Sequence, residues 1–327
     1  MKKKPPSFRP FRTIAVRSTG AALISTLLVT AFIVTLATIQ FRYMRSATQN
    51  AASIKHSSIA WQYVYSVEAF AKLLLLRDLK SPNSRHDHLS EAWALTHSLP
   101  TWAEWDISFA IQDLNGRANI NNLLSASETM NMEYAKLLKV IFENNHSDSG
   151  FVYKLADWMD SNSTPRPKGA EDTSYQTTKN NSYLTANQAF IDLSELLLLG
   201  LDTSSLQAIS GSLVALPQAS KININTASLP LLEALSNAST AHKIVQSREA
   251  TGGFESVDDF KKDSSTAGAS FPWGWIDVKS DFFILHCHAT VGNIQLFTET
   301  MLYRNPTDET IVILNRKQVP FSRRSAP

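Results

Sequence analysis

The chain has 327 residues, of which 43% are hydrophobic and 18% charged, so it is long enough for a sizeable core and too apolar for general disorder. Residues 1–20 hold six Lys and Arg and no acid, which leaves 25 bases against 29 acids in the rest, a balance that argues against a broad nucleic-acid-binding surface. The single cysteine, Cys287, excludes a disulfide within the chain.

An apolar segment follows the basic one. Residues 21–39, AALISTLLVTAFIVTLATI, contain no charge, Gly or Pro. As a helix they would span about 28 Å, close to the ~30 Å hydrocarbon core of a bilayer. The cations before this segment predict a single-pass inner-membrane protein, with its N-terminus in the cytoplasm and its bulk in the periplasm of a Gram-negative cell. A cleaved signal peptide is the alternative, although its apolar run is expected to be shorter, about 7–15 residues.

The helix is expected to continue beyond the membrane. Neither Gly nor Pro occurs from residue 21 to residue 80, which predicts one long helix with its membrane half at 21–39 and its other half packed on a domain. Apolar residues recur at helical spacing and form one stripe: Ala51, Ile54, Trp61, Tyr65, Ala69, Leu73 and Leu76.

The middle of the chain is predicted to be mainly helical. A helix is expected at about 87–98, then a half-buried strand at 107–111, and the Asn115–Gly116 turn signal suggests a hairpin. Further helices are predicted at 125–143, 151–160 and 192–200. The polar stretch 161–187 is too long for a plain connector and predicts a functional or ligand-ordered loop.

Three strands are predicted at the C-terminal end, in WIDVKSDFFILHCHATV, NIQLFTETMLYR and ETIVILNRKQV. The expected fold class is α+β, in which helices are inserted between the parts of a sheet. The His286–Cys287–His288 triplet invites a zinc interpretation, but in a strand the two His project to the face opposite Cys287, so the three cannot converge on one ion.

The N-terminus resembles the class III leader of type IV pilins and pseudopilins, in which a basic leader ends in a glycine that directly precedes the apolar helix. The resemblance implies that a prepilin peptidase cleaves between Gly20 and Ala21 and methylates Ala21. Most family members have Glu at the position of Ser25. A carboxylate inside a bilayer costs roughly 2.5–3.5 kcal/mol unless it has a partner, and in pilin-like fibres that partner is the N-terminal amine of a neighbouring subunit. A tip subunit could therefore do without it; an ordinary single-span anchor is the alternative.

Several segments resemble, in chain order, the minor pseudopilins of type II secretion known as general secretion pathway protein K: DLNGRANINNL, LADWMDSN, GAEDTSY, ANQAFIDLSELL and KININTASLPLLEAL. The resemblance implies a long N-terminal helix on a small antiparallel pseudopilin sheet, with a large helical domain inserted. It divides the chain into a leader (1–20), the helix (21–80), the first part of the core (81–118), the inserted domain (119–262) and C-terminal strands (263–327). The implied role is to initiate or cap the pseudopilus with the minor pseudopilins named I and J, next to the major pseudopilin.

Residues 224–260 are similar to a helix-hairpin-helix module, which grips nucleic-acid phosphates through a Gly-containing turn and nearby cations. Here the turn at 235–240 reads LSNAST, without glycine, and cations are few. The segment is therefore expected to be a scaffold or partner surface, with no nucleic acid bound; a membrane-anchored DNA-uptake component is the alternative function.

Five oxygen-bearing residues lie in or beside the polar stretch 161–187 and form a candidate calcium site, because Ca²⁺ takes six to eight oxygen ligands: Asp157, Asp160, Asn162, Glu171 and Asp172. The spacing is not that of an EF-hand, and the resemblance adds that K pseudopilins bind calcium in this domain. A solvated acidic loop is the alternative. No catalytic motif such as G-x-S-x-G or H-E-x-x-H occurs in the sequence, so no enzyme activity is expected.

Overall fold

The computed structural model describes residues 19–81, 86–98, 105–176 and 182–320, which fall into two compact units, Met1–Ser57 and Ser58–Pro327. Most of the predicted leader, residues 1–18, lies outside the described part of the chain. The predicted boundaries at residues 80, 118 and 262 stay predictions.

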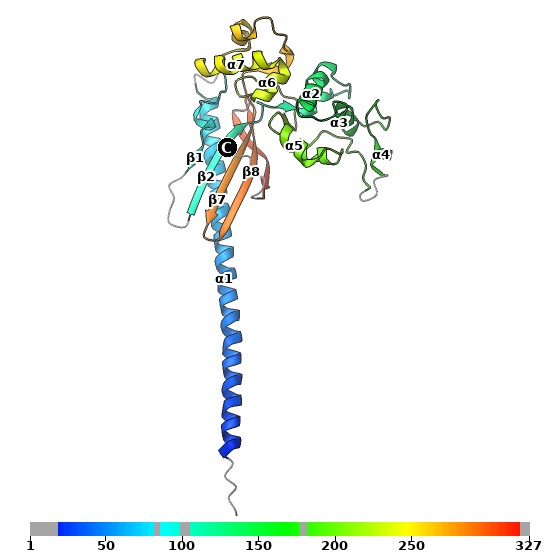
Figure 1. Cartoon of the computed structure of the whole chain (residues 1–327). Coiled ribbons are helices and arrows are strands. Elements are labelled where there is room, and N and C mark those ends of the chain that lie inside the picture. The colour runs from blue at the N-terminus through cyan, green and yellow to red at the C-terminus, as the bar shows by residue number, and fades with distance from the viewer. Residues whose placement is uncertain (1–18, 82–85, 99–104, 177–181, 321–327) are drawn as a thin grey trace, which may run out of the picture. The chain divides into compact units, whose positions relative to one another are not determined.

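Helix α1 (Thr19–Leu79) confirms the predicted continuous helix and contributes residues to both units (Figure 1). By length and composition it could cross a membrane. In its apolar part, Ser and Thr hydroxyls donate to backbone carbonyls three or four residues earlier; the bond from Ser25 Oγ to Ala21 O, for example, is 2.8 Å long. These bonds satisfy polar groups that would find no water in hydrocarbon.

In the second unit, α1 packs on the sheet through small and branched side chains. The buried stripe is Ala60, Val64, Val67, Ala71 and Leu75. The stripe defined from the sequence lies largely on another face, since Tyr65 is 51% and Leu73 is 63% exposed. Both stripes have helical spacing, so periodicity alone could not choose between them. Alanine and valine make up most of the buried stripe, and their small side chains let the helix approach the sheet closely.

The sheet has five antiparallel strands and confirms the three strands predicted at the C-terminal end. Their order is β1 (His97–Ser98), β2 (Trp105–Asp113), β7 (Phe282–Val291), β8 (Ile294–Asn305) and β9 (Thr310–Gln318). Cys287 is buried in the core that α1 covers, whereas its neighbours His286 and His288 are only partly buried. The strand alternation therefore separates the cysteine from the histidines, as expected.

Residues 114–281 are inserted between β2 and β7, which confirms the α+β fold with an inserted helical domain (Figure 1). The helices of the insertion are α2 (Met132–Asn144), α3 (Phe151–Met159), α4 (Asp172–Gln176), α5 (Thr203–Ile209), α6 (Leu229–Leu235), α7 (Ala238–Thr251) and α8 (Val257–Lys262). Short 3₁₀ turns join them: η2 (Ile120–Leu123), η3 (Leu193–Leu197), η4 (Ser264–Thr266) and η5 (Trp273–Trp275). Two small parallel ribbons pair β3 (Ala118–Asn119) with β4 (Leu213–Val214), and β5 (Ile222–Asn223) with β6 (Ile276–Asp277).

Buried and half-buried asparagines hold the insertion together. Asn119, Asn121 and Asn122 donate side-chain hydrogen bonds to backbone carbonyls about 70–100 residues away, at Gln218, Leu216 and Ser220 among others. Each carboxamide also accepts a backbone N–H: that of Leu216 at Asn119, that of Phe190 at Asn121 and that of Ser220 at Asn122. The DLNGRANINNL segment therefore serves packing, because it satisfies backbone groups that irregular chain would otherwise bury unpaired.

Two local predictions were wrong. Residues 87–98 form the 3₁₀ turn η1 (Ala92–Ala94) and β1 instead of a helix, because Asp87 and Trp93 are both drawn into the core, where Trp93 packs edge-on against Phe283. The Asn115–Gly116 turn does not close a hairpin, since β3 pairs with β4 and not with β2. Asn115 Oδ1 instead accepts the backbone N–H groups of residues 281 and 282, which join the insertion to β7.

Helix boundaries also differ. The helix predicted at 125–143 begins at Met132, where Asn131 caps it and an antiparallel bridge joins Leu124 to Met130. The segment predicted as a helix at 192–200 is the 3₁₀ turn η3, which Asp192 begins with a capping box. The helix predicted at 151–160 is confirmed as α3.

Candidate functional site

Helix α3 carries two acids into the interior of the insertion. Asp157 is in its last turn and Asp160 caps its C-terminus, and both carboxylates are 0% exposed. The sequence places them there because α3 buries nearly all of its short length, including Phe151, Leu155 and Trp158. Two buried acids at the negative end of a helix dipole need a cation or several hydrogen-bond donors.

The loop after α3 provides those donors. Arg166 Nη1 donates to Asp157 Oδ1 at 2.7 Å and also to Asp160 Oδ2, and the Arg166 backbone N–H donates to Asp157 Oδ2 at 3.0 Å. Asn162 donates to Asp160 Oδ1 from its backbone nitrogen at 3.2 Å and from Nδ2 at 2.8 Å. All four oxygens of the two aspartates therefore accept a hydrogen bond from residues 162–166.

Glu171 is the exception in this pocket. It is 3% exposed, and neither Oε1 nor Oε2 has a hydrogen-bond partner among the residues that the structure describes. Burial raises the pKa of Glu171 to about 7, and the negative charges of Asp157, Asp160 and Asp172 add to that rise. A buried carboxylate without donors is unfavourable, and either a proton or a cation at this position would relieve that cost.

Asp172 has a different role from the other acids. Its Oδ1 accepts the backbone N–H of Thr185 at 2.8 Å and the Thr185 hydroxyl at 2.6 Å. These bonds hold the pKa of Asp172 below its ordinary value. Asp172 therefore fastens the end of the polar stretch, and it lies close enough to raise the pKa of Glu171.

Gly169 allows the loop to close over α3. A Cβ at this position would lie 1.8 Å from Asp157 Oδ2 and 2.7 Å from its Cγ. Any side chain there would push the carboxylate out of place.

We define the acidic pocket as Asp157, Asp160, Arg166, Gly169 and Glu171. Of the five predicted metal ligands, the structure brings Asp157, Asp160 and Glu171 into it; Asn162 and Asp172 lie at its border, where they support the loop. Arg166 and Gly169 were missed by sequence reasoning, although a lone base between two prolines, in TPRPKG, was a usable signal.

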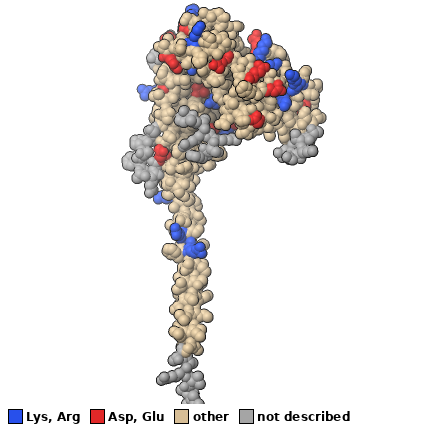
Figure 2. All heavy atoms as spheres, in the orientation of Figure 1, with Lys and Arg blue, Asp and Glu red and all other residues tan. Residues whose placement is uncertain are grey.

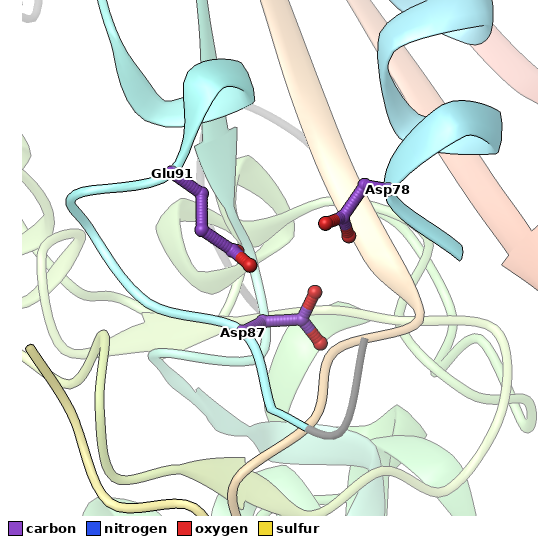
Figure 3. A group of neighbouring side chains, drawn as sticks. All are labelled: Asp78, Asp87 and Glu91. Atoms are coloured by element: carbon purple, nitrogen blue, oxygen red, sulfur yellow. The ribbon is translucent and has the colours of Figure 1, made fainter. Parts of the chain in front are cut away.

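A second cluster of acids lies where α1 ends. Asp78 comes from α1, and Asp87 and Glu91 come from the segment after it; their carboxylates point toward one another (Figure 3). Their oxygens lie within 4.8 Å of one another, a spacing that could hold a metal ion. Burial and the charges of Glu91 and Asp87 raise the pKa of Asp78 to about 6.

Arg304 of β8 already supplies the cation in this cluster. It donates from Nη2 to both oxygens of Asp87, at 2.6 and 2.5 Å, and from Nη1 to Asp78 Oδ2 at 2.7 Å. Glu91 Oε2 accepts from Trp93 Nε1 at 2.6 Å. We call Asp78, Asp87, Glu91 and Arg304 the Arg304 cluster. Its ion pairs act as an internal clamp, because they join α1 to β8. No sequence motif predicted this cluster.

Buried polar groups extend the Arg304 cluster into the insertion. Asp113 Oδ2 accepts from Ser280 Oγ at 2.5 Å, from Asn223 Nδ2 at 3.2 Å and from the Thr226 hydroxyl. Ser280 in turn donates its backbone N–H to Asp87 Oδ2 at 2.7 Å. The KININT segment, which contains Asn223 and Thr226, thus anchors the insertion to the sheet.

The helix-hairpin-helix-like segment is α6 and α7, joined at Ser236–Asn237. Arg248, the base in the last turn of α7, donates from Nη1 to the carbonyls of Ile224 and Ala227, at 3.1 and 2.7 Å. That guanidinium is therefore committed to the backbone. On the face of the second unit visible in Figure 2, acidic and basic side chains are interspersed. This geometry favours the scaffold interpretation of the segment.

Comparison with known proteins gives consistent matches. Two family models, both described as type II secretion system protein K, match residues 116–218 and 222–279. The chain is 33% identical over 263 residues to type II secretion system protein K of Pseudomonas aeruginosa, covering 76% of this chain and 78% of that protein. It is 30% identical over 311 residues to the protein of the same name from Klebsiella pneumoniae, covering 88% and 93%.

A solved structure has a similar fold. It is a chain in the crystal structure of the GspK-GspI-GspJ complex from the type 2 secretion system of enterotoxigenic Escherichia coli. The likeness has a TM-score of 0.73 at 24% identity and covers 83% of this chain and 99% of that one.

Proposed function

Since the chain belongs to the type II secretion system protein K family and is a minor pseudopilin, we propose that it occupies the tip of the periplasmic pseudopilus and initiates or caps its assembly there. The observation that carries the proposal is the insertion of residues 114–281 into the pseudopilin sheet. So bulky a domain at the end of a fibre would block the addition of a further subunit above it. The role is structural rather than catalytic.

The surface of α1 supports packing against other subunits. Tyr65 and Leu73 remain exposed within the second unit. Exposed large apolar side chains in a row at helical spacing are typical of a surface that another helix covers. We propose that the partners are the I- and J-type minor pseudopilins and the major pseudopilin. The similar solved chain, by its title, is part of a GspK-GspI-GspJ complex.

Processing at the start of α1 is part of the proposal. A prepilin peptidase would cleave between Gly20 and Ala21 and methylate Ala21, leaving the N-terminus on the cytoplasmic side of the inner membrane and the bulk in the periplasm. Both residues are exposed in the structure, and a Cβ on Gly20 would meet nothing within 4 Å. Ser25 Oγ bonds to its own helix at Ala21 O, so this position needs no partner from a neighbouring subunit.

We also propose that the acidic pocket binds Ca²⁺. The unpartnered oxygens of Glu171 are buried within reach of the charges of Asp157 and Asp160, and carboxylate oxygens are the ligands that a hard divalent cation takes. Glu171, Asp157 and Asp160 would hold the ion, and Asp172 would keep the loop in place through Thr185. The bound ion would supply the positive charge that Glu171 lacks and would order the polar stretch 161–187.

Fibre length tests the tip role. Cells that assemble pseudopili are given increasing amounts of the chain at a constant level of major pseudopilin, and fibres are counted and measured by electron microscopy. An initiating or capping subunit is expected to give more and shorter fibres as its level rises. Fibre number and length that do not change with the level of the chain would contradict the proposal.

A further inference from the structure

We propose that Arg166 is a tethered counter-ion, which occupies the cation position between Asp157 and Asp160 in the calcium-free protein and must leave it when calcium binds. The inference rests on the proposed calcium site and assigns the residue that sets its affinity.

The contacts of Arg166 are those expected of a stand-in cation. A single nitrogen, Nη1, bridges Asp157 Oδ1 and Asp160 Oδ2, two oxygens from carboxylates that are both 0% exposed. Calcium would need the same two oxygens, because it is bound most readily by carboxylates. The guanidinium brings one positive charge where a calcium ion would bring two, and it leaves both oxygens of Glu171 without a partner. The guanidinium thus pairs with two of the three acids, and among the described residues the third has no donor.

The loop backbone is fixed independently of the Arg166 side chain, so it can keep its position when that side chain moves. Pro165 and Pro167 flank Arg166, so the ring of the first fixes its own φ and the ring of the second restricts Arg166 to extended conformations. The Arg166 backbone N–H donates to Asp157 Oδ2, and its carbonyl accepts from the Gly169 N–H at 2.8 Å. Departure of the guanidinium therefore requires rotation about side-chain bonds only.

The Arg166 side chain is also less enclosed than the acids that it pairs with. The Arg166 side chain is 22% exposed, whereas the carboxylates that it bridges are 0% exposed. A long arginine side chain at the rim can turn its charged end into water while its stem stays on the protein. Arg166 therefore competes with calcium for Asp157 and Asp160, and the measured calcium affinity includes the free energy of displacing it.

The test is a calcium titration of the full-length chain in detergent micelles, by isothermal titration calorimetry, for the wild type, Arg166→Gln and Lys168→Gln. Lys168 is the matched control, since it is an exposed base two residues away in the same loop. Loss of the competitor is expected to tighten calcium binding about 10-fold or more in Arg166→Gln, with a change below about 2-fold in Lys168→Gln. The variant should also unfold at a lower temperature than the wild type without calcium and at a similar temperature with saturating calcium.

A second measurement follows the side chain itself. The NMR signal of the Arg166 guanidinium is expected to shift from a restrained position toward that of solvated arginines when calcium is added. Equal affinities of wild type and Arg166→Gln, weaker binding by the variant, or an unmoved guanidinium signal would each overturn the role of Arg166 while leaving the calcium site in place. If wild type and variant both bind no calcium, the calcium site fails and the inference fails with it.

Discussion

The acidic pocket and the Arg304 cluster both gather three carboxylates around one arginine, yet they are expected to do different things. In the Arg304 cluster the Arg304 side chain is only 5% exposed, and Asp78, Asp87 and Glu91 each accept hydrogen bonds. In the acidic pocket the Arg166 side chain is 22% exposed, and Glu171 has no donor among the described residues. We therefore expect that the number of acids does not define an ion site, and that the deciding features are a carboxylate without donors and a cation that can leave.

Removal of Arg304 is expected to have the largest effect. Arg304→Met keeps the apolar stem but leaves Asp78 and Asp87 buried without their cation, which should reduce the free energy of unfolding by about 3–5 kcal/mol. Chemical denaturation at pH 7 measures the loss, with Arg77→Met on the exposed face of α1 as the control. A loss below about 1 kcal/mol would mean that the Arg304 cluster is not the clamp described here.

The pH dependence of stability should reveal the titration of the Asp113 carboxyl, which lies at the border of the Arg304 cluster. Burial raises the pKa of Asp113 from 3.8 to about 6 in the folded state, so the folded protein binds a proton that the unfolded chain has already lost. This contribution to stability is fully present below pH ~4 and is lost as the pH rises through ~6. It amounts to about 3 kcal/mol.

The asparagine in Asp113→Asn does not titrate. The stability of this variant relative to the wild type should therefore rise by about 3 kcal/mol as the pH is raised from 4 to 7. Denaturation curves of both proteins at several pH values give the difference. A difference that does not change with pH would show that Asp113 is ionised throughout this range.

Gly169→Ala should distort the acidic pocket. The added Cβ would overlap Asp157 Oδ2, and overpacking of this kind costs about 1–3 kcal/mol. We expect a lower unfolding temperature and weaker calcium binding, measured by differential scanning calorimetry and by titration. Gly211→Ala, where a Cβ would meet nothing within 4 Å, is the control. Normal calcium binding by Gly169→Ala would place the site elsewhere.

Glu171→Gln is expected to have the smallest effect on stability, and the direction of the effect should depend on whether calcium is present. Glu171→Gln removes a buried charge that has no partner, so the calcium-free protein should become more stable by about 1 kcal/mol. The same change removes a ligand, so the rise in unfolding temperature on calcium addition should largely disappear. Thermal unfolding with and without calcium tests both, with Glu143→Gln on the exposed face of α2 as the control. A full calcium response in Glu171→Gln would exclude Glu171 as a ligand.

Sequence patterns predicted the elements whose signals are local. The continuity of α1, the three C-terminal strands and the separation of Cys287 from its neighbouring histidines all follow from periodicity over a few residues. The acidic pocket was partly predictable for a similar reason, because its acids lie within residues 157–171 and are brought together by one helix end and one loop.

Long-range contacts could not be predicted in this way. Arg304 pairs with Asp78, which lies 226 residues away in the sequence. The burial of Asp87 in this cluster is one reason why residues 87–98 do not form the predicted helix. The face of α1 that packs on the sheet was also undetermined, because α1 has apolar residues at helical spacing on more than one face. The role of Arg166 depends on which oxygens remain unsatisfied, and only the three-dimensional structure shows that.

The position of the chain in the fibre is the most direct test of the proposed function. Pseudopili sheared from cells that carry a C-terminally tagged chain can be labelled with gold and viewed by electron microscopy, with the tagged major pseudopilin as the comparison. A tip subunit predicts one label at one end of each fibre, whereas the major pseudopilin is labelled along the shaft. Labels of the tagged chain spread along the shaft would contradict the tip assignment.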